Sequence, residues 1–161
     1  MFQEAASRLC TACGMCCNGV LFEIVRLQPQ DSMKELEKLG MQINRRKTQP
    51  YFKQPCRFLN DCTCTIYEQR PTRCRRFECL QLKMLAAEEI TEAAAAAKIE
   101  EARTQVQRVR DLLAGAGDAS TDEALEERVR HVFGDQTDTP LYHEMQTLRR
   151  LLSREFRAMT E

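Results

Sequence analysis

Nine cysteines, all between positions 10 and 79, are the residues of this sequence whose type and spacing could do chemistry. The first group follows the pattern Cys10-x-x-Cys13-x-x-Cys16-Cys17. A C-x-x-C turn lets two sulfurs converge on one cation, because the backbone between them curls around it. Two such turns overlap here. Side chains of adjacent residues normally diverge, so we expect Cys16 and Cys17 to share one tetrahedron only if a cluster or a second ion is present.

A second group supplies five more sulfurs: Cys56, Cys62, Cys64, Cys74 and Cys79. One tetrahedral ion takes four thiolates, so nine cysteines exceed a single site and approach two. Inert buried cysteines would not be concentrated among arginines and loop residues, whereas reactive and metal-binding cysteines occur in electropositive surroundings of this kind. We therefore expect most of these cysteines to bind metal.

The spacing leaves the kind of metal centre open. Four thiolates suit zinc and iron–sulfur clusters equally well. Cys10, Cys13 and Cys16 have the spacing of a bacterial ferredoxin motif, but the cysteine-proline that continues that motif is missing and Cys17-Asn18 follows instead. We favour zinc or iron ions in one or two sites, which would be structural or carried. The alternative is an iron–sulfur cluster with a redox or enzymatic role.

Other features of the chain predict a cytoplasmic protein. The first residues lack the basic start and apolar run of a secretory signal. No stretch approaches the ~20 apolar residues that a membrane span needs, so we expect no membrane partner. Stable disulfides are rare in the cytosol, and an odd number of cysteines does not suit a complete disulfide framework.

Charge is distributed unevenly, although the net charge is +0. Residues 1–82 hold 13 Lys and Arg against 8 Asp and Glu, and residues 83–161 hold 11 against 16. A basic segment can indicate nucleic-acid binding. Metal-bound thiolates would also need positive charge nearby, and five arginines lie among the cysteines. We favour this charge balance and keep a zinc-dependent nucleic-acid-binding module as a second alternative. The arginines are Arg57, Arg70, Arg73, Arg75 and Arg76.

The cysteine-bearing part of the sequence resembles the CxxCxxCC family, whose members are also called YkgJ-like cysteine cluster proteins and are described as zinc- or iron-chelating. The resemblance covers residues 8–80 and rests on the run from Cys10 to Cys17, on Cys56-Arg57-Phe58-Leu59, and on the segment CTIYEQRPTRCRRFEC that ends at Cys79. It implies metal chelation and leaves Cys62 as an additional cysteine. The ligands that it implies are Cys10, Cys13, Cys16, Cys17, Cys56, Cys64, Cys74 and Cys79.

Few elements are predicted to position the cysteines within residues 1–82. Residues 20–25 are β-branched and aromatic and predict a short strand. Residues 32–39 predict a short helix, with Ser32 and Glu35 as a capping box and Gly40 at its C-terminal end. The polar, proline-containing residues 44–57 predict a loop. Residues 56–79 are dense in cysteine and arginine and have too few aliphatic residues to form a core alone, so we expect metal to organise residues 1–82 as one module.

Residues 83–161 contain no cysteine and predict a helical extension. Strong helix formers over residues 80–114 predict one helix about 50 Å long, ended by the glycines that follow. Ser120 and Glu123 form a capping box for a shorter helix, and Thr139-Pro140 opens the last one.

Three apolar stripes are expected to pack on one another as an antiparallel helical hairpin or small bundle. A partner-binding coiled coil is the alternative, so the extension could bind another protein or a second copy of the chain. The stripes are Ile99, Ala102, Val106, Val109 and Leu113, then Leu125, Val129 and Val132, then Leu141, Met145, Leu148, Leu152, Phe156 and Met159.

The predicted fold class is therefore mainly α, with an irregular cysteine-rich metal-binding module of few short strands before an antiparallel helical extension. The sequence has no Gly-rich phosphate loop, no H-E-x-x-H motif and no nucleophile elbow, so no catalytic constellation stands apart from the cysteines. His131 and His143 are far in sequence from the cysteines, and we expect both on solvated helix faces.

Overall fold

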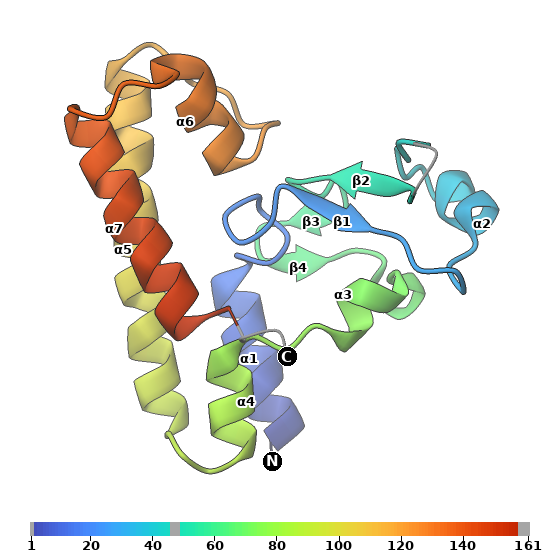
Figure 1. The fold of residues 1–161 in the computed structure, drawn as a ribbon. Coiled ribbons are helices and arrows are strands. Elements are labelled where there is room, and N and C mark those ends of the chain that lie inside the picture. Colours follow the sequence, from blue (N-terminus) through green and yellow to red (C-terminus); the bar gives the residue numbers. More distant parts are fainter. Residues whose placement is uncertain (1, 46–48, 158–161) are drawn as a thin grey trace.

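The computed structural model describes residues 2–45 and 49–157. These residues form seven α-helices, one short 3-10 turn and two antiparallel two-stranded sheets, so the mainly-α prediction is confirmed (Figure 1). No helix in this part of the chain is both long and apolar enough to cross a membrane. In chain order the elements are α1 (Phe2–Cys13), β1 (Ile24–Arg26), α2 (Met33–Lys38), β2 (Tyr51–Lys53), β3 (Leu59–Asn60), β4 (Thr63–Cys64), η1 (Tyr67–Gln69), α3 (Thr72–Arg76), α4 (Leu80–Ala86), α5 (Glu92–Gly115), α6 (Leu125–Phe133) and α7 (Pro140–Glu155).

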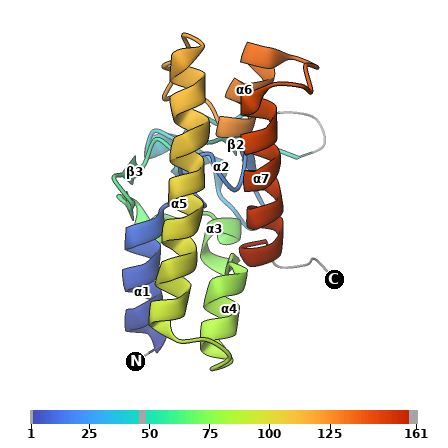
Figure 2. The same ribbon diagram turned by 90° about the vertical axis from the view of Figure 1, so that its left-hand side faces the viewer.

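The two longest helices, α5 and α7, lie side by side and run in opposite directions (Figures 1 and 2). Their apolar stripes are buried in one core, as the spacing predicts, and α6 adds Leu125 and Val129 to it. Met159, the last residue of the expected stripe, lies outside the described residues. The buried stripe residues are Ile99, Ala102, Val106, Val109 and Leu113 of α5, and Leu141, Met145, Leu148 and Leu152 with the following Phe156 at α7.

The prediction of one continuous helix over residues 80–114 is wrong. The chain forms α4 and then α5, because Glu88 adopts a left-handed conformation with φ of 58° and ends the first helix. The Glu89 N–H donates to the Met84 carbonyl at 2.9 Å, which closes the turn. Thr91 then caps α5 by accepting a hydrogen bond from the Ala94 N–H at 3.2 Å. The 24 residues of α5 give a length of about 36 Å.

The start of α6 also differs from its prediction, whereas the start of α7 agrees. Ser120 and Glu123 do not cap α6, which begins at Leu125. The Ser120 hydroxyl instead donates to the Asp122 carboxylate at 2.7 Å. For α7 the expected cap is confirmed, since the Thr139 hydroxyl accepts a hydrogen bond from the Tyr142 N–H.

The N-terminal half contains several elements that the sequence pattern did not predict, among them α1, β2, the β3–β4 hairpin and α3. Residues 2–13 form α1, and residues 51–53 of the expected loop form β2. The expected strand over residues 20–25 begins only at Ile24, where β1 pairs antiparallel with β2 and Val25 lies opposite Phe52. Both of those side chains are buried in a small second core.

The predicted short helix is confirmed as α2, with both of its ends as expected. Ser32 accepts a hydrogen bond from the Glu35 N–H at 3.3 Å. At the other end Gly40 has φ of +100°, and the Met41 N–H donates to the Leu36 carbonyl at 3.0 Å. This pattern is a Schellman motif, and it turns the chain so that Leu36 and Met41 enter the second core.

Gly19 marks a close approach between the cysteine-bearing loops and the start of α6. Its carbonyl accepts a hydrogen bond from the Leu125 N–H at 3.0 Å. Its φ is +80°, and a Cβ at this position would lie 2.9 Å from the Ala124 Cα. This distance is too short for two non-bonded carbon atoms, and the Ala124 Cα cannot move away because it belongs to the backbone, so only glycine fits here.

We expect Gly19→Ala to destabilise the protein by about 2–4 kcal/mol, because it adds a steric clash to an unfavourable φ. Gly134→Ala is the matched control. Gly134 also has a positive φ of +54°, but apart from its chain neighbours no atom of the described residues lies within 4 Å of the position that a Cβ would take there. Chemical denaturation of both variants should show a cost of about 1 kcal/mol for Gly134→Ala. Equal losses would mean that the close approach to Ala124 contributes nothing.

Candidate metal centre

The first four cysteines lie at and just beyond the end of α1. Cys10 and Cys13 are three residues apart on this helix and therefore share a face. The expected C-x-x-C turn over Cys10 and Cys13 is instead the last part of this helix. Gly14, with φ of +65°, ends the helix, and its carbonyl accepts a hydrogen bond from the Cys17 N–H at 3.0 Å. This turn brings Cys16 and Cys17 back toward the helix end.

Cys16 and Cys17 do not diverge as expected, because their sulfurs lie 3.7 Å apart. The hydrogen bond between them lowers the pKa of Cys16 to about 7, although burial acts in the opposite direction. The same hydrogen bond raises the pKa of Cys17, with burial as the next cause. The Cys17 carbonyl also accepts a hydrogen bond from the Cys56 N–H at 2.7 Å, which ties the first cysteine group to the second.

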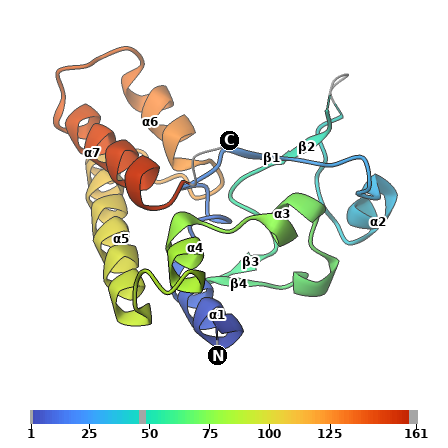
Figure 3. The same ribbon diagram turned by 60° about the horizontal axis from the view of Figure 1, so that its bottom comes forward.

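The second group is distributed over the β3–β4 hairpin, α3 and the start of α4, which lies beside α1 (Figure 3). Cys56 precedes the β3–β4 hairpin, which carries Cys62 in its turn and Cys64 in β4. Cys74 lies in α3, and Cys79 is the residue that caps the start of α4. Short connections between these elements keep all five close to the end of α1.

Cys10, Cys13, Cys16 and Cys79 lie at α1 and α4, close enough for their thiolates to repel one another. Burial raises the pKa of Cys10 to about 11, and the thiolates of Cys16 and Cys79 raise it further. Burial also raises the pKa of Cys13, to about 12, with additional repulsion from the thiolates of Cys16, Cys79 and Cys10. The Arg70 guanidinium lowers the pKa of Cys10 and of Cys16.

Cys17, Cys56, Cys64 and Cys74 form a second set whose thiolates also repel one another. Burial raises the pKa of Cys74 to about 12, with repulsion from the thiolates of Cys56, Cys16 and Cys64. Burial is also the main cause of the raised pKa of Cys56, followed among charged neighbours by Cys64 and Cys16. Cys17 is repelled by Cys16, Cys56 and Cys74. Half-buried thiolates that repel one another are a donor set that a cation stabilises, so their chemistry fits metal binding.

The sulfurs are more widely spaced than a single ion would hold them. Within the described residues, the metal-ligating groups whose donor atoms all lie within 4.8 Å of one another are Glu123, Glu127 and His131, and no three cysteines meet this limit. The sulfurs of Cys16 and Cys17 form a close pair. Binding of separate ions would therefore draw the cysteine-bearing loops together.

Arg70 is the arginine that acts directly on the thiolates. It is half-buried, its Nε donates to the Tyr67 carbonyl at 2.8 Å, and its guanidinium carbon lies 3.5 Å from the centre of the Tyr67 ring. These contacts hold a positive charge that lowers the pKa of Cys10, Cys16 and Cys74. Arg57 has another role, since it donates to the Gly40 carbonyl.

Asp31 is a supporting residue that the sequence pattern did not reveal. One carboxylate oxygen accepts hydrogen bonds from the Thr72 N–H at 2.8 Å and from the Thr72 hydroxyl at 2.7 Å. The other accepts from the Gln28 N–H at 2.8 Å. Burial would raise the pKa of Asp31, but these hydrogen bonds outweigh it and the pKa is lowered. Asp31 thus fixes the start of α3, two residues before Cys74.

We expect Asp31→Ala to destabilise the protein by about 2 kcal/mol, because three hydrogen bonds to a carboxylate are lost and the Thr72 N–H at the start of α3 loses its acceptor. Metal should also pass to a chelating dye several times faster, since Cys74 would be held less firmly. Asp135→Ala, a change at an exposed position, is the control and should alter neither quantity. An Asp31→Ala protein that keeps its metal as firmly as the wild type would contradict this positioning role.

Gln54 is a second supporting residue that was missed. Its side chain is 1% exposed, and its Nε2 donates a long hydrogen bond of 3.4 Å to the Cys16 carbonyl. Its Oε1 has no hydrogen-bond partner within the described part of the chain. The buried amide therefore lies against the backbone that presents Cys16.

The two histidines do not join the cysteines. His131 lies with Glu123 and Glu127, and its Nδ1 is 3.1 Å from the Glu123 carboxylate. Lys53 forms an ion pair with Glu127 at 2.9 Å, so this surface cluster already contains a cation. His143 is exposed and lies 3.8 Å from the carboxylate of Asp138.

Comparison with known proteins gives one match. The family model named CxxCxxCC, described as "Putative zinc- or iron-chelating domain", matches residues 9–98. This is more than half of the 161 residues and extends beyond the resemblance over residues 8–80, as far as the first turns of α5. Searches of curated proteins and of solved structures found no match.

Proposed function

The chain belongs to the CxxCxxCC family of zinc- or iron-chelating domains, and on that premise we propose that it binds two metal centres through two sets of four cysteines. The closeness of these thiolates supports this proposal, and Cys16 lies between the two sets because it raises the pKa of members of both. Each set has the four thiolates of a closed tetrahedral site. The first set is Cys10, Cys13, Cys16 and Cys79, and the second is Cys17, Cys56, Cys64 and Cys74.

We propose that the metal is zinc or iron and that it is structural or carried. The second core around β1 and β2 has only six buried residues, which supports a module that depends on metal for much of its stability. Cys56, Cys64 and Cys74 pack against that core, so ligand placement and folding would be linked. Eight thiolates need a reducing compartment, which supports a cytoplasmic location.

An iron–sulfur cluster is the second candidate, and the spacing of the sulfurs favours it. A cluster of several irons holds its thiolates farther apart than one ion does, and no three cysteine sulfurs of the described chain lie within 4.8 Å of one another. Arg70 would then offset the charge of a reduced cluster, because it faces thiolates of both sets.

Elemental analysis of anaerobically purified protein, with a sulfide assay and an absorption spectrum, tests the proposal. Colourless protein with zinc or iron and no sulfide supports two ion sites. Brown protein with sulfide and absorption near 400 nm that dithionite bleaches supports the cluster instead. Protein that contains neither metal and takes up neither zinc nor iron under reducing conditions would contradict both candidates.

A further inference from the structure

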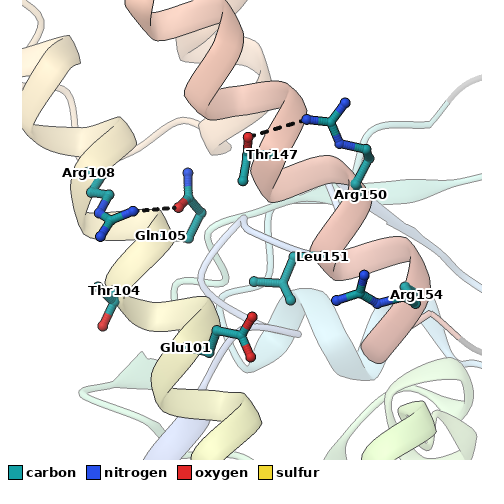
Figure 4. A pocket seen from close by; sticks show the side chains of 8 residues that line it. All are labelled: Glu101, Thr104, Gln105, Arg108, Thr147, Arg150, Leu151 and Arg154. Carbon is teal, nitrogen blue, oxygen red and sulfur yellow. Dashed lines mark hydrogen bonds between the residues drawn. The ribbon is translucent and has the colours of Figure 1, made fainter.

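A groove lies between α5 and α7, in the helical half and outside the segment that the family model matches. It has a volume of about 480 Å³, which is within the range of small-molecule sites. Gln105 and Leu151, both buried, form its base. Three exposed arginines line it, Arg108 from α5 and Arg150 and Arg154 from α7, as Figure 4 shows.

Two of these guanidinium groups have little to bind within the protein. Arg108 donates one long hydrogen bond of 3.4 Å to the Gln105 side-chain oxygen, and Arg150 donates one of 3.4 Å to the Thr147 hydroxyl. Neither has a carboxylate within 4.0 Å among the described residues. A guanidinium group has five N–H donors, so most of those on Arg108 and Arg150 are directed to solvent.

The acidic groups around the groove are already engaged by other partners. Glu101 forms an ion pair with Lys98 at 2.8 Å, and Glu144 accepts a hydrogen bond of 2.6 Å from the Gln105 Nε2. Arg154 pairs with Glu155 at 2.6 Å. Among the described residues, Arg108 and Arg150 therefore have no ion-pair partner, whereas the Glu144 carboxylate near them keeps its charge because the Gln105 amide is neutral.

We propose that this groove binds a small anion through Arg108 and Arg150, as a phosphate or carboxylate group held between α5 and α7. Guanidinium groups match the geometry of both oxyanions and can bind them with paired hydrogen bonds. Arg108 lies on the α5 side and Arg150 on the α7 side, with Gln105 and Thr147 between them (Figure 4), so an anion bound by both would lie across the groove. Arg154 adds a third positive charge at the end of the groove, and the Thr147 hydroxyl adds a further donor.

Isothermal titration of the purified full chain, with its metal, tests the proposal at low ionic strength, where surface charges are least screened. Inorganic phosphate and glutarate are the two probes, because they separate a phosphate site from a carboxylate site and leave the thiolate centres intact. At least one should bind with a Kd below about 1 mM. Arg108→Gln and Arg150→Gln should each raise that Kd about tenfold. Arg26→Gln, a change at an exposed arginine of β1, is the control.

The double variant Arg108→Lys/Arg150→Lys distinguishes a site that needs guanidinium groups from one that needs only positive charge. Lysine keeps the charge and loses the paired hydrogen bonds, so binding should weaken severalfold. Unchanged binding by the lysine variant would overturn the proposal. Absence of binding to both probes, or an equal loss in Arg26→Gln, would overturn it as well. Metal content measured on each variant confirms that the cysteine centres are intact.

Discussion

Replacing Cys64 by serine is expected to remove about one metal equivalent or to prevent folding, because a structural site rarely survives the loss of one of its four ligands. Cys62→Ser should keep the wild-type metal content and Tm. The Cys64 thiolate raises the pKa of both Cys56 and Cys74, so it faces the second set. Cys62 instead packs on Gly14, where its sulfur lies 3.0 Å from the position that a Cβ would take.

The two substitutions are a matched pair, since the residues are two positions apart on the same hairpin. Metal content by elemental analysis and Tm by circular dichroism measure the effect. Damage by Cys62→Ser together with a silent Cys64→Ser would mean that the ligand assignment in the second segment is wrong.

Cys13→Ser extends the test to the first set. It should also remove about one equivalent, and the double variant Cys13→Ser/Cys64→Ser should remove about two. Loss of all metal from a single variant that still folds would show one shared centre, in which Cys16 and Cys17 join the two sets, in place of two separate sites.

Removal of the metal by a chelator is expected to unfold the cysteine-bearing loops while most of the far-UV helical signal remains. The core between α5 and α7 is built from aliphatic side chains and Phe156, with cysteines only at its edge. The second core is small, and its surroundings include Cys56, Cys64 and Cys74, so it should lose order with the metal. Circular dichroism and amide exchange of the apo-protein measure both effects, and adding metal back should restore the loops.

A loss of nearly all helical signal on chelation would show that the two halves do not separate in this way. The outcome is informative because Leu9, Met15, Val20 and Leu21 belong to the same core as α5 and α7. Some helical signal from α1 should therefore be lost with the metal, while the signal of α5 and α7 stays.

Several parts of the fold that depend on local signals were predicted from the sequence, although the capping box at Ser120 and Glu123 was wrong. The cap at Ser32 and the apolar stripe of α5 follow from spacings of three or four residues, the start of α7 follows from Thr139-Pro140, and the structure contains all three. Signals that depend on distant partners were missed. The strand β2 forms because it pairs with β1, and α4 ends because Glu88 adopts a conformation that is uncommon for glutamate.

The same division holds for the candidate site. Residue type and spacing identified the cysteines, but not how they group. Cys79 faces Cys10 and Cys13 because α4 lies beside α1, a contact between segments about seventy residues apart. Asp31 and Gln54 were missed because their partners, Thr72 and Cys16, are 41 and 38 residues away in sequence.

The most direct test of two four-cysteine centres is a count of reactive thiols in the metal-loaded protein. Alkylation of native protein under anaerobic conditions, followed by mass spectrometry and paired with elemental analysis, should label Cys62 alone. Chelation in denaturant should then make all nine thiols reactive. Rapid labelling of several of the other eight cysteines while the full metal content is retained would contradict the account.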